Sequence, residues 1–82
     1  MSEVVTALLS RDLKSRIEAA FPHLTGRSIR HGYLYVAPSG GRFSIPNDHG
    51  DEVARFTVLK IISKMEIALE LDREQIIAAL FP

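Results

Sequence analysis

The sequence predicts an α+β domain in which helices are packed on one face of a small antiparallel sheet. Residues 5–21 and 51–69 repeat apolar side chains at helical spacing, whereas residues 28–37 and 42–45 between them alternate as strands do. A short helix is expected after residue 72. The predicted order is therefore α-β-β-α-α, with one more strand before the pair if residues 25–30 are extended.

The composition is that of one globular domain spanning residues 1–82. Ten Lys and Arg balance ten Asp and Glu, which argues against a strongly basic nucleic-acid binder. The absence of cysteine excludes disulfides, thiolate metal ligands and thiol nucleophiles. No apolar run reaches the roughly 20 residues of a bilayer-spanning helix, and Met1-Ser2-Glu3 lacks the positive charge that opens a secretion signal. We therefore expect a cytoplasmic protein without a membrane partner.

The first predicted helix has an apolar residue at every fourth position. Pro22 ends it, because the residue before a proline avoids the α region. Its start is open: Ser2 is one candidate cap, and Ser10 is another if the segment breaks into two short helices there. The repeating positions are Val5, Leu9, Leu13, Ile17 and Phe21.

A β-hairpin is predicted next, from two alternating runs, Tyr33–Val36 and Arg42–Ile45. The Pro38-Ser39-Gly40-Gly41 stretch between them has the residues of a tight turn. Within the first run, Tyr33 and Tyr35 share one face of the strand, and Leu34 and Val36 share the other. We expect the tyrosines to face water.

The second long helix is predicted over residues 51–69, with an unusually wide apolar arc. Phe56, Leu59 and Ile67 lie beside its main apolar stripe, which suggests a central position or a partner. The final helix has an N-terminal capping box formed by Asp72 and Gln75. These helices are expected to supply most of the core.

A cluster of basic and aromatic residues is the candidate nucleic-acid site. Residues 21–46 contain three arginines and no acidic residue, and arginine beside tyrosine suits a phosphate backbone with stacked bases. The alternative is an ordinary sheet face, in which tyrosines are simply good strand formers. The candidate binding residues are Arg27, Arg30, Tyr33, Tyr35 and Arg42.

His31 is the one candidate catalytic residue. Arg30 beside it favours the neutral imidazole, the form that a general base for attack by a ribose 2′-hydroxyl needs. The alternative is a surface histidine at a strand edge. Asp48, His49 and Asp51 lack regular ligand spacing, and the sequence has no phosphate-binding or hydrolase motif, so no metal or cofactor is expected.

Three strings resemble the HicA family of small toxin ribonucleases. They are Leu13–Phe21, the hairpin from Tyr33 to Pro46, and Thr57–Ile62. The resemblance covers about 65 of the 82 residues and implies the family's α-β-β-β-α fold, which is like that of double-stranded-RNA-binding domains. It also implies RNA binding, with His31 as the base.

One departure concerns the catalytic position. The family has Gly-Ser-His entering the second strand, whereas this chain reads Arg30-His31-Gly32. An ungapped alignment places Gly32 at the family's histidine, so His31 is one residue off. A bulge at Gly32 would restore the family's geometry, and otherwise the chain is an inactive relative.

Two functions are therefore open, and whether the chain is an enzyme is open with them. The first is a HicA-like RNA-binding protein, either a metal-independent ribonuclease toxin or an inactive relative. The second is a non-catalytic protein-binding module, such as a small inhibitor or adaptor of phage or mobile-element origin. It would act through an apolar helix face, often as a homodimer, with Phe56, Leu59, Ile67, Leu80 and Phe81 at the interface.

Overall fold

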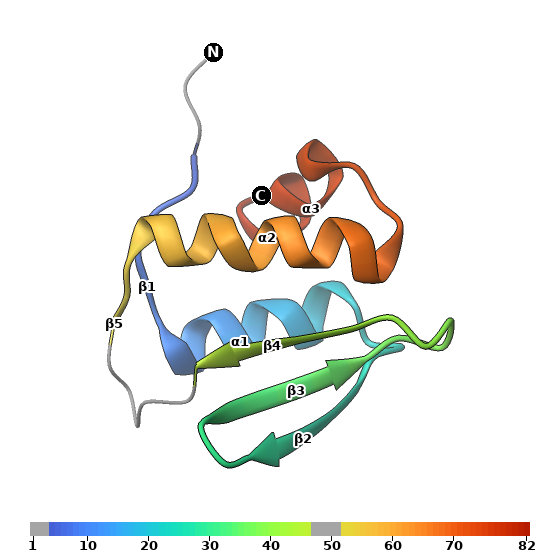
Figure 1. Cartoon of the computed structure of the whole chain (residues 1–82). Coiled ribbons are helices and arrows are strands. Elements are labelled where there is room, and N and C mark those ends of the chain that lie inside the picture. The colour runs from blue at the N-terminus through green and yellow to red at the C-terminus, as the bar shows by residue number, and fades with distance from the viewer. Residues whose placement is uncertain (1–3, 47–51) are drawn as a thin grey trace.

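The computed structural model describes residues 4–46 and 52–82. Three helices and a three-stranded antiparallel sheet form an α+β fold, as predicted (Figure 1). The helices are α1 (Ser10–Ala20), α2 (Arg55–Leu69) and α3 (Arg73–Leu80). The sheet contains β2 (Thr25–Ile29), β3 (Gly32–Val36) and β4 (Arg42–Pro46), and a separate pair joins β1 (Leu8–Leu9) to β5 (Glu52–Val53).

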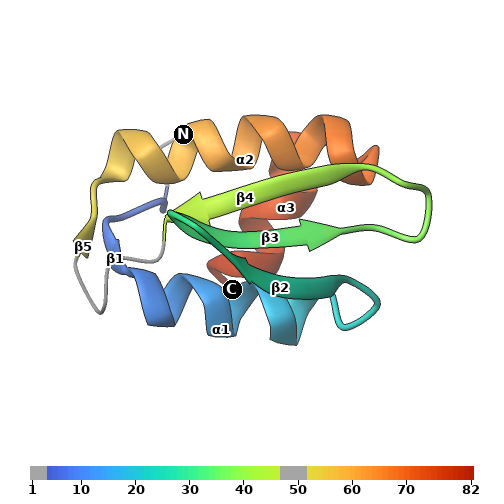
Figure 2. The same cartoon turned by 60° about the horizontal axis from the view of Figure 1, so that its bottom comes forward.

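The sheet packs with one face on α1 and α2, while α3 lies on the far side of these two helices (Figure 2). The strand order is β2-β3-β4, so β3 is central. Between α1 and α2 the chain forms the three strands of this sheet and then β5, and the sheet includes the extra strand at residues 25–29 that the sequence left open. No described element covers the second face of the sheet (Figure 2).

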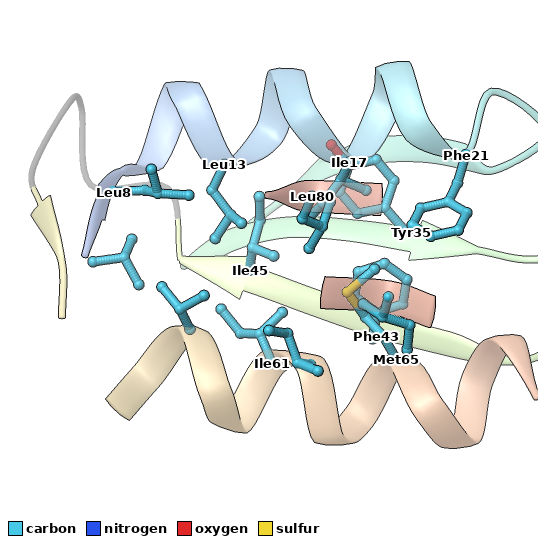
Figure 3. Packing of buried hydrophobic residues seen from close by; sticks show 14 of the residues in the cluster. Leu8, Leu13, Ile17, Phe21, Tyr35, Phe43, Ile45, Ile61, Met65 and Leu80 are labelled. Carbon is cyan, nitrogen blue, oxygen red and sulfur yellow. The ribbon is translucent and has the colours of Figure 1, made fainter. Parts of the chain in front are cut away.

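The core lies between the sheet and the helices (Figure 3). Leu13 and Ile17 of α1 and Ile62 and Met65 of α2 are fully buried. Phe43 of β4 meets them from the sheet. The helical spacing of the two long apolar stripes is what turns these side chains inward.

The N-terminal segment decides where the two long helices begin. α1 begins at Ser10, the later of the two starts that the sequence left open, although its N-cap is Leu9, and α2 begins at Arg55 instead of near residue 51. Before each helix the chain is extended, because Leu8 pairs with Val53 and Leu9 with Glu52. This pairing joins segments about 43 residues apart in the chain, and helical periodicity carries no information about it.

The short pair of strands is fastened to the start of α2. The Arg55 side chain donates from Nε to the carbonyl oxygen of Val5 over 3.0 Å. Val5 and Leu8 are buried, although neither belongs to a helix. Val5 is thus a core residue that fits the four-residue spacing of the helix by coincidence, which is why that spacing extends past the true start of α1.

Two turns connect the three strands. Ile29 pairs with Gly32, so Arg30 and His31 form a two-residue turn between β2 and β3. The predicted continuous strand from residue 28 is therefore wrong at its start. Between β3 and β4, Gly40 takes a positive φ of 95°, which favours glycine. The predicted turn there is confirmed.

The second turn packs tightly against the end of α2. A Cβ atom added to Gly41 would overlap the carbonyl oxygen of Ala68 and lie 2.8 Å from the Cα of Ala68. Only a glycine allows this approach of two backbones. The hairpin is thereby held at one end against the helix layer.

The link between α2 and α3 uses two standard helix ends. Glu70 adopts the left-handed conformation with φ 56°, and both its amide and that of Leu71 donate to the carbonyl of Glu66. The predicted capping box of α3 is confirmed, with the Asp72 amide donating to Oε1 of Gln75 over 2.9 Å. α3 is therefore fixed in direction from its first residue.

Candidate interaction surface on the open face of the sheet

The strand register decides which side chains face the helices. Tyr33 lies opposite Ile45, and Tyr35 lies opposite Phe43. Residues directly opposite each other in an antiparallel pair share a face, and Phe43 and Ile45 are buried in the core. Both tyrosines are therefore on the covered face of the sheet.

Tyr35 is a core residue, which corrects its assignment to a nucleic-acid surface. It is 1% exposed, and its ring stacks on Phe43 at 5.4 Å and meets the edge of Tyr33 at 5.2 Å. The physical reason is the partner strand, whose apolar residues can only face the core. Tyr33 is half-buried and packs against the same core, so neither ring offers an open stacking platform.

A polar cluster on α1 satisfies the buried end of Tyr35, and sequence reasoning missed it. The Tyr35 hydroxyl donates to Oε2 of Glu18 over 2.8 Å, and Nζ of Lys14 lies 2.9 Å from the same oxygen. Nζ of Lys14 also lies 4.6 Å from the centre of the Tyr33 ring. The four-residue spacing of Lys14 and Glu18 on a helix was the available signal.

The pKa values follow from this geometry. Hydrogen bonds from Lys14 and from Tyr35 lower the pKa of Glu18, and the hydrogen bond to Glu18 raises the pKa of Lys14. Burial raises the pKa of Tyr35, with the Glu18 carboxylate adding to the effect. A cavity of about 270 Å³ adjoins the cluster. The Glu18 carboxylate accepts from both Lys14 and Tyr35. The cluster therefore has a structural role and is not a proton-transfer site.

Acid is expected to weaken the fold through Glu18. Its pKa in the folded chain is lower than the ordinary value of 4.5, so protonation costs more in the folded chain than in the unfolded one. The stabilisation is present above the ordinary pKa and is lost as pH falls through the folded value. Between pH 5 and pH 3, the free energy of unfolding should fall more steeply in the wild type than in Glu18→Gln. Urea denaturation across this range measures both slopes, and equal slopes would contradict the assignment.

The uncovered face of the sheet has an apolar centre. On β3, Leu34 and Val36 point outward and are only half-buried. Water-facing positions of a central antiparallel strand are usually polar. Ile29, at the end of β2, adds a side chain that is 41% exposed. We call Ile29, Leu34 and Val36, together with Arg27 and Arg42 beside them, the open face.

Arginines flank this centre on both sides. Leu34 lies between Arg27 of β2 and Ser44 of β4, and Val36 lies between Thr25 and Arg42. Arg27 and Arg42 are exposed, and neither makes a hydrogen bond or ion pair with any described residue. The open face therefore combines apolar surface with positive charge on opposite flanks.

The structure places His31 away from any catalytic partner. His31 and Arg30 are exposed in the turn between β2 and β3, and within residues 4–46 and 52–82 neither has a hydrogen bond or ion pair. The strands pair regularly, Gly32 with Pro46 and Tyr33 with Ile45, so the bulge that would realign His31 is not formed. The residue sits at a turn instead of on a strand face.

The predicted partner-binding residues differ in their exposure and fall into three groups. Phe56 and Ile67 are exposed on α2, at 62% and 82%. Leu80, in contrast, is 1% exposed, which corrects its assignment to an interface. Leu59 and Phe81 are partly buried against the core. Exposed polar residues lie between Phe56 and Ile67 along the helix, namely Lys60, Ser63 and Lys64, so the two do not form one apolar patch.

The C-terminal residues are occupied within the molecule. Arg16 donates from Nη1 to the carbonyl of Leu80 over 2.9 Å, and its guanidinium lies 5.1 Å from the centre of the Phe81 ring. α3 is thereby fastened to α1. The burial of Leu80 follows from this contact and from the core beneath it.

Among the described residues, no three His, Asp or Glu side chains gather to hold a metal ion. Asp48, His49 and Asp51 lie outside the described residues. Within the same part of the chain, no helix has the length and apolar character needed to cross a bilayer.

The chain has no match among known proteins in three comparisons. No family model matches it, and neither a curated protein nor a solved structure does. The resemblance to the HicA family stays a prediction, and the function proposed for this chain rests on the geometry of the sheet.

Proposed function

We propose that this chain is a non-catalytic protein-binding module whose contact surface is the open face of the β2-β3-β4 sheet. The observation that carries the proposal is the outward position of Leu34 and Val36 on the central strand. An exposed apolar centre with a charged rim is the usual composition of a protein interface. The apolar helix face predicted from the sequence is a weaker candidate, because Leu80 is buried in the core and Leu59 and Phe81 pack against it.

Two features favour a binding role over a catalytic one. His31 has no partner in the described chain to orient it or to hold its proton, and the Glu18 carboxylate is engaged by Lys14 and Tyr35. General acid–base work needs an oriented group within reach of a substrate. Neither residue meets that requirement.

RNA binding is the second candidate, and one observation supports it. Arg27, Arg30 and Arg42 have no acidic partner among the described residues, and free guanidiniums suit phosphates. The burial of Tyr35 removes the base-stacking half of that proposal. The capture experiment that tests protein binding therefore also measures whether RNA is recovered.

The experiment is affinity capture of the tagged chain from its native host, scored for both protein and RNA. The test variant is Leu34→Thr/Val36→Thr, which removes apolar surface while threonine keeps strand propensity. We expect a specific protein to be captured by the wild type and to be lost, about tenfold or more, with this variant. Circular dichroism and thermal denaturation confirm that the variant is folded.

A matched control places a change on the helix side. Ser15→Asp lies on the exposed side of α1 and should leave the captured protein unchanged. Capture that survives the double threonine variant would overturn the proposal. So would recovery of RNA alone, with loss of that RNA in Arg27→Ala/Arg42→Ala, because the RNA candidate would then hold.

A further inference from the structure

We infer that the open face takes an acidic amphipathic helix of a partner protein, about three turns long and lying along β3. The inference rests on the proposed function, and it specifies the secondary structure and the charge of the partner segment. It follows from three properties of the face, which are its size, the position of its arginines and the lack of acidic residues in its three strands.

The dimensions of the sheet match one helix. Two strand spacings of about 4.8 Å make the three-stranded sheet about 10 Å wide, and a helix with side chains is about 10 Å across. Each strand has five residues, which span about 17 Å and correspond to about eleven residues of helix. One such helix would cover Leu34 and Val36 together.

A strand is a poorer occupant of this face. A strand laid flat on the sheet would bury its own backbone groups without hydrogen-bond partners, whereas a helix satisfies its own. A strand added at the β2 edge would be hydrogen-bonded, yet it would leave Leu34 and Val36 uncovered because they lie on β3. The apolar centre therefore selects a helix.

The positions of the two arginines favour acidic residues on both sides of the bound helix. Arg27 lies beside Leu34 on the β2 side, and Arg42 lies beside Val36 on the β4 side. The two arginines are thus on opposite flanks and two residues apart along β3, about 7 Å. Residues 19–46 contain no acidic side chain. A bound helix should carry a carboxylate on each side of its apolar stripe, offset by about one turn.

A second copy of this chain is a poor occupant. Two open faces pressed together would bring a surface with Arg27 and Arg42 against an identical one, and the three strands contain no acidic residue to pair with these arginines. Like charges brought together at an interface cost affinity. The face therefore favours a different chain over self-association.

The test uses three synthetic helical peptides of about 14 residues, held helical by a side-chain staple. They share one leucine stripe and differ only in its flanking residues, which are glutamate, glutamine or lysine. Fluorescence anisotropy measures their binding to the full chain. We expect the glutamate peptide to bind about tenfold more tightly than the glutamine peptide, and amide shift changes in NMR spectra to map to β2, β3 and β4.

Charge reversal makes the test specific. Arg27→Glu/Arg42→Glu should lose the preference for the glutamate peptide and gain one for the lysine peptide. The control variant, Arg11→Glu/Lys64→Glu, makes the same charge change at exposed helix positions and should bind as the wild type does.

Three outcomes would overturn the inference. Equal binding of the glutamate and glutamine peptides would remove the acidic requirement, while the proposed protein-binding function would stand on its own capture result. Failure of all three peptides, with capture of a protein that depends on Leu34 and Val36, would show that the occupant is not a helix. Displacement of the glutamate peptide by a short RNA duplex at lower concentration would assign the arginines to phosphate.

Discussion

Gly41→Ala is expected to destabilise the fold by about 3 kcal/mol, near the upper end of the usual cost of overpacking. The new methyl group would overlap the carbonyl oxygen of Ala68, and that oxygen belongs to helix backbone, which cannot rotate away. A domain of this size has a total stability of about 4–12 kcal/mol. The substitution should therefore lower the urea midpoint strongly, as measured by circular dichroism.

Gly40→Ala is the matched control, because it adds the same methyl group one residue earlier. Gly40 has open space around its Cβ position but a positive φ of 95°, so its cost is only conformational, about 1 kcal/mol. Gly41→Ala should be clearly the worse of the two. Equal losses would mean that the hairpin does not pack against α2 as described.

Tyr35→Ala is the second large effect, with an expected loss of about 3–5 kcal/mol. The change removes a ring that is 1% exposed and stacked on Phe43, and truncation of a buried aromatic residue leaves a cavity. Tyr35→Phe keeps the ring and loses only the hydrogen bond to Glu18, which costs about 1 kcal/mol because Glu18 is partly exposed. Thermal and urea denaturation measure both.

The same series separates a core tyrosine from a surface tyrosine. Leu34→Ala on the opposite face of β3 serves as the control, and it should cost about 1 kcal/mol because that face is open to water. If Tyr35→Ala cost no more than Leu34→Ala, the assignment of the two faces would be reversed.

Which face of the sheet is buried can be predicted from the sequence. Phe43 and Ile45 are the apolar members of a run whose other members, Arg42 and Ser44, are polar. A turn that pairs Val36 with Arg42 sets Tyr35 opposite Phe43. Residue type alone suggests an exposed face for the tyrosines, whereas the register of the two paired strands decides which face they share.

The extended segments before α1 and α2 cannot be predicted from the spacing of apolar residues. Val5, Leu9 and Leu13 fit helical spacing, yet Leu9 pairs with Glu52 in a strand. A two-residue strand has no periodicity of its own, and its partner is distant in the chain. The same limit applies to the polar cluster, because the contact between Glu18 and Tyr35 depends on how α1 crosses the sheet.

The open face was mislocated for a related reason. The alternation of the strand correctly separates Leu34 and Val36 from the tyrosines, but the expectation that the tyrosines face water assigns the uncovered face to the wrong pair. No described element packs on the face with Leu34 and Val36, so these apolar side chains stay uncovered. The arginines were found because charge asymmetry is visible in the sequence, and Arg27 and Arg42 do lie on that face.

The pairing of β1 with β5 affects more than the chain's N-terminal end. The chain enters both supporting helices from one hydrogen-bonded ribbon, while the close approach of Gly41 to Ala68 holds the hairpin at the opposite end of α2. Sliding of α1 past α2 would break the ribbon. A partner on the sheet therefore meets a pre-organised platform, and little of its binding energy is spent on ordering this chain.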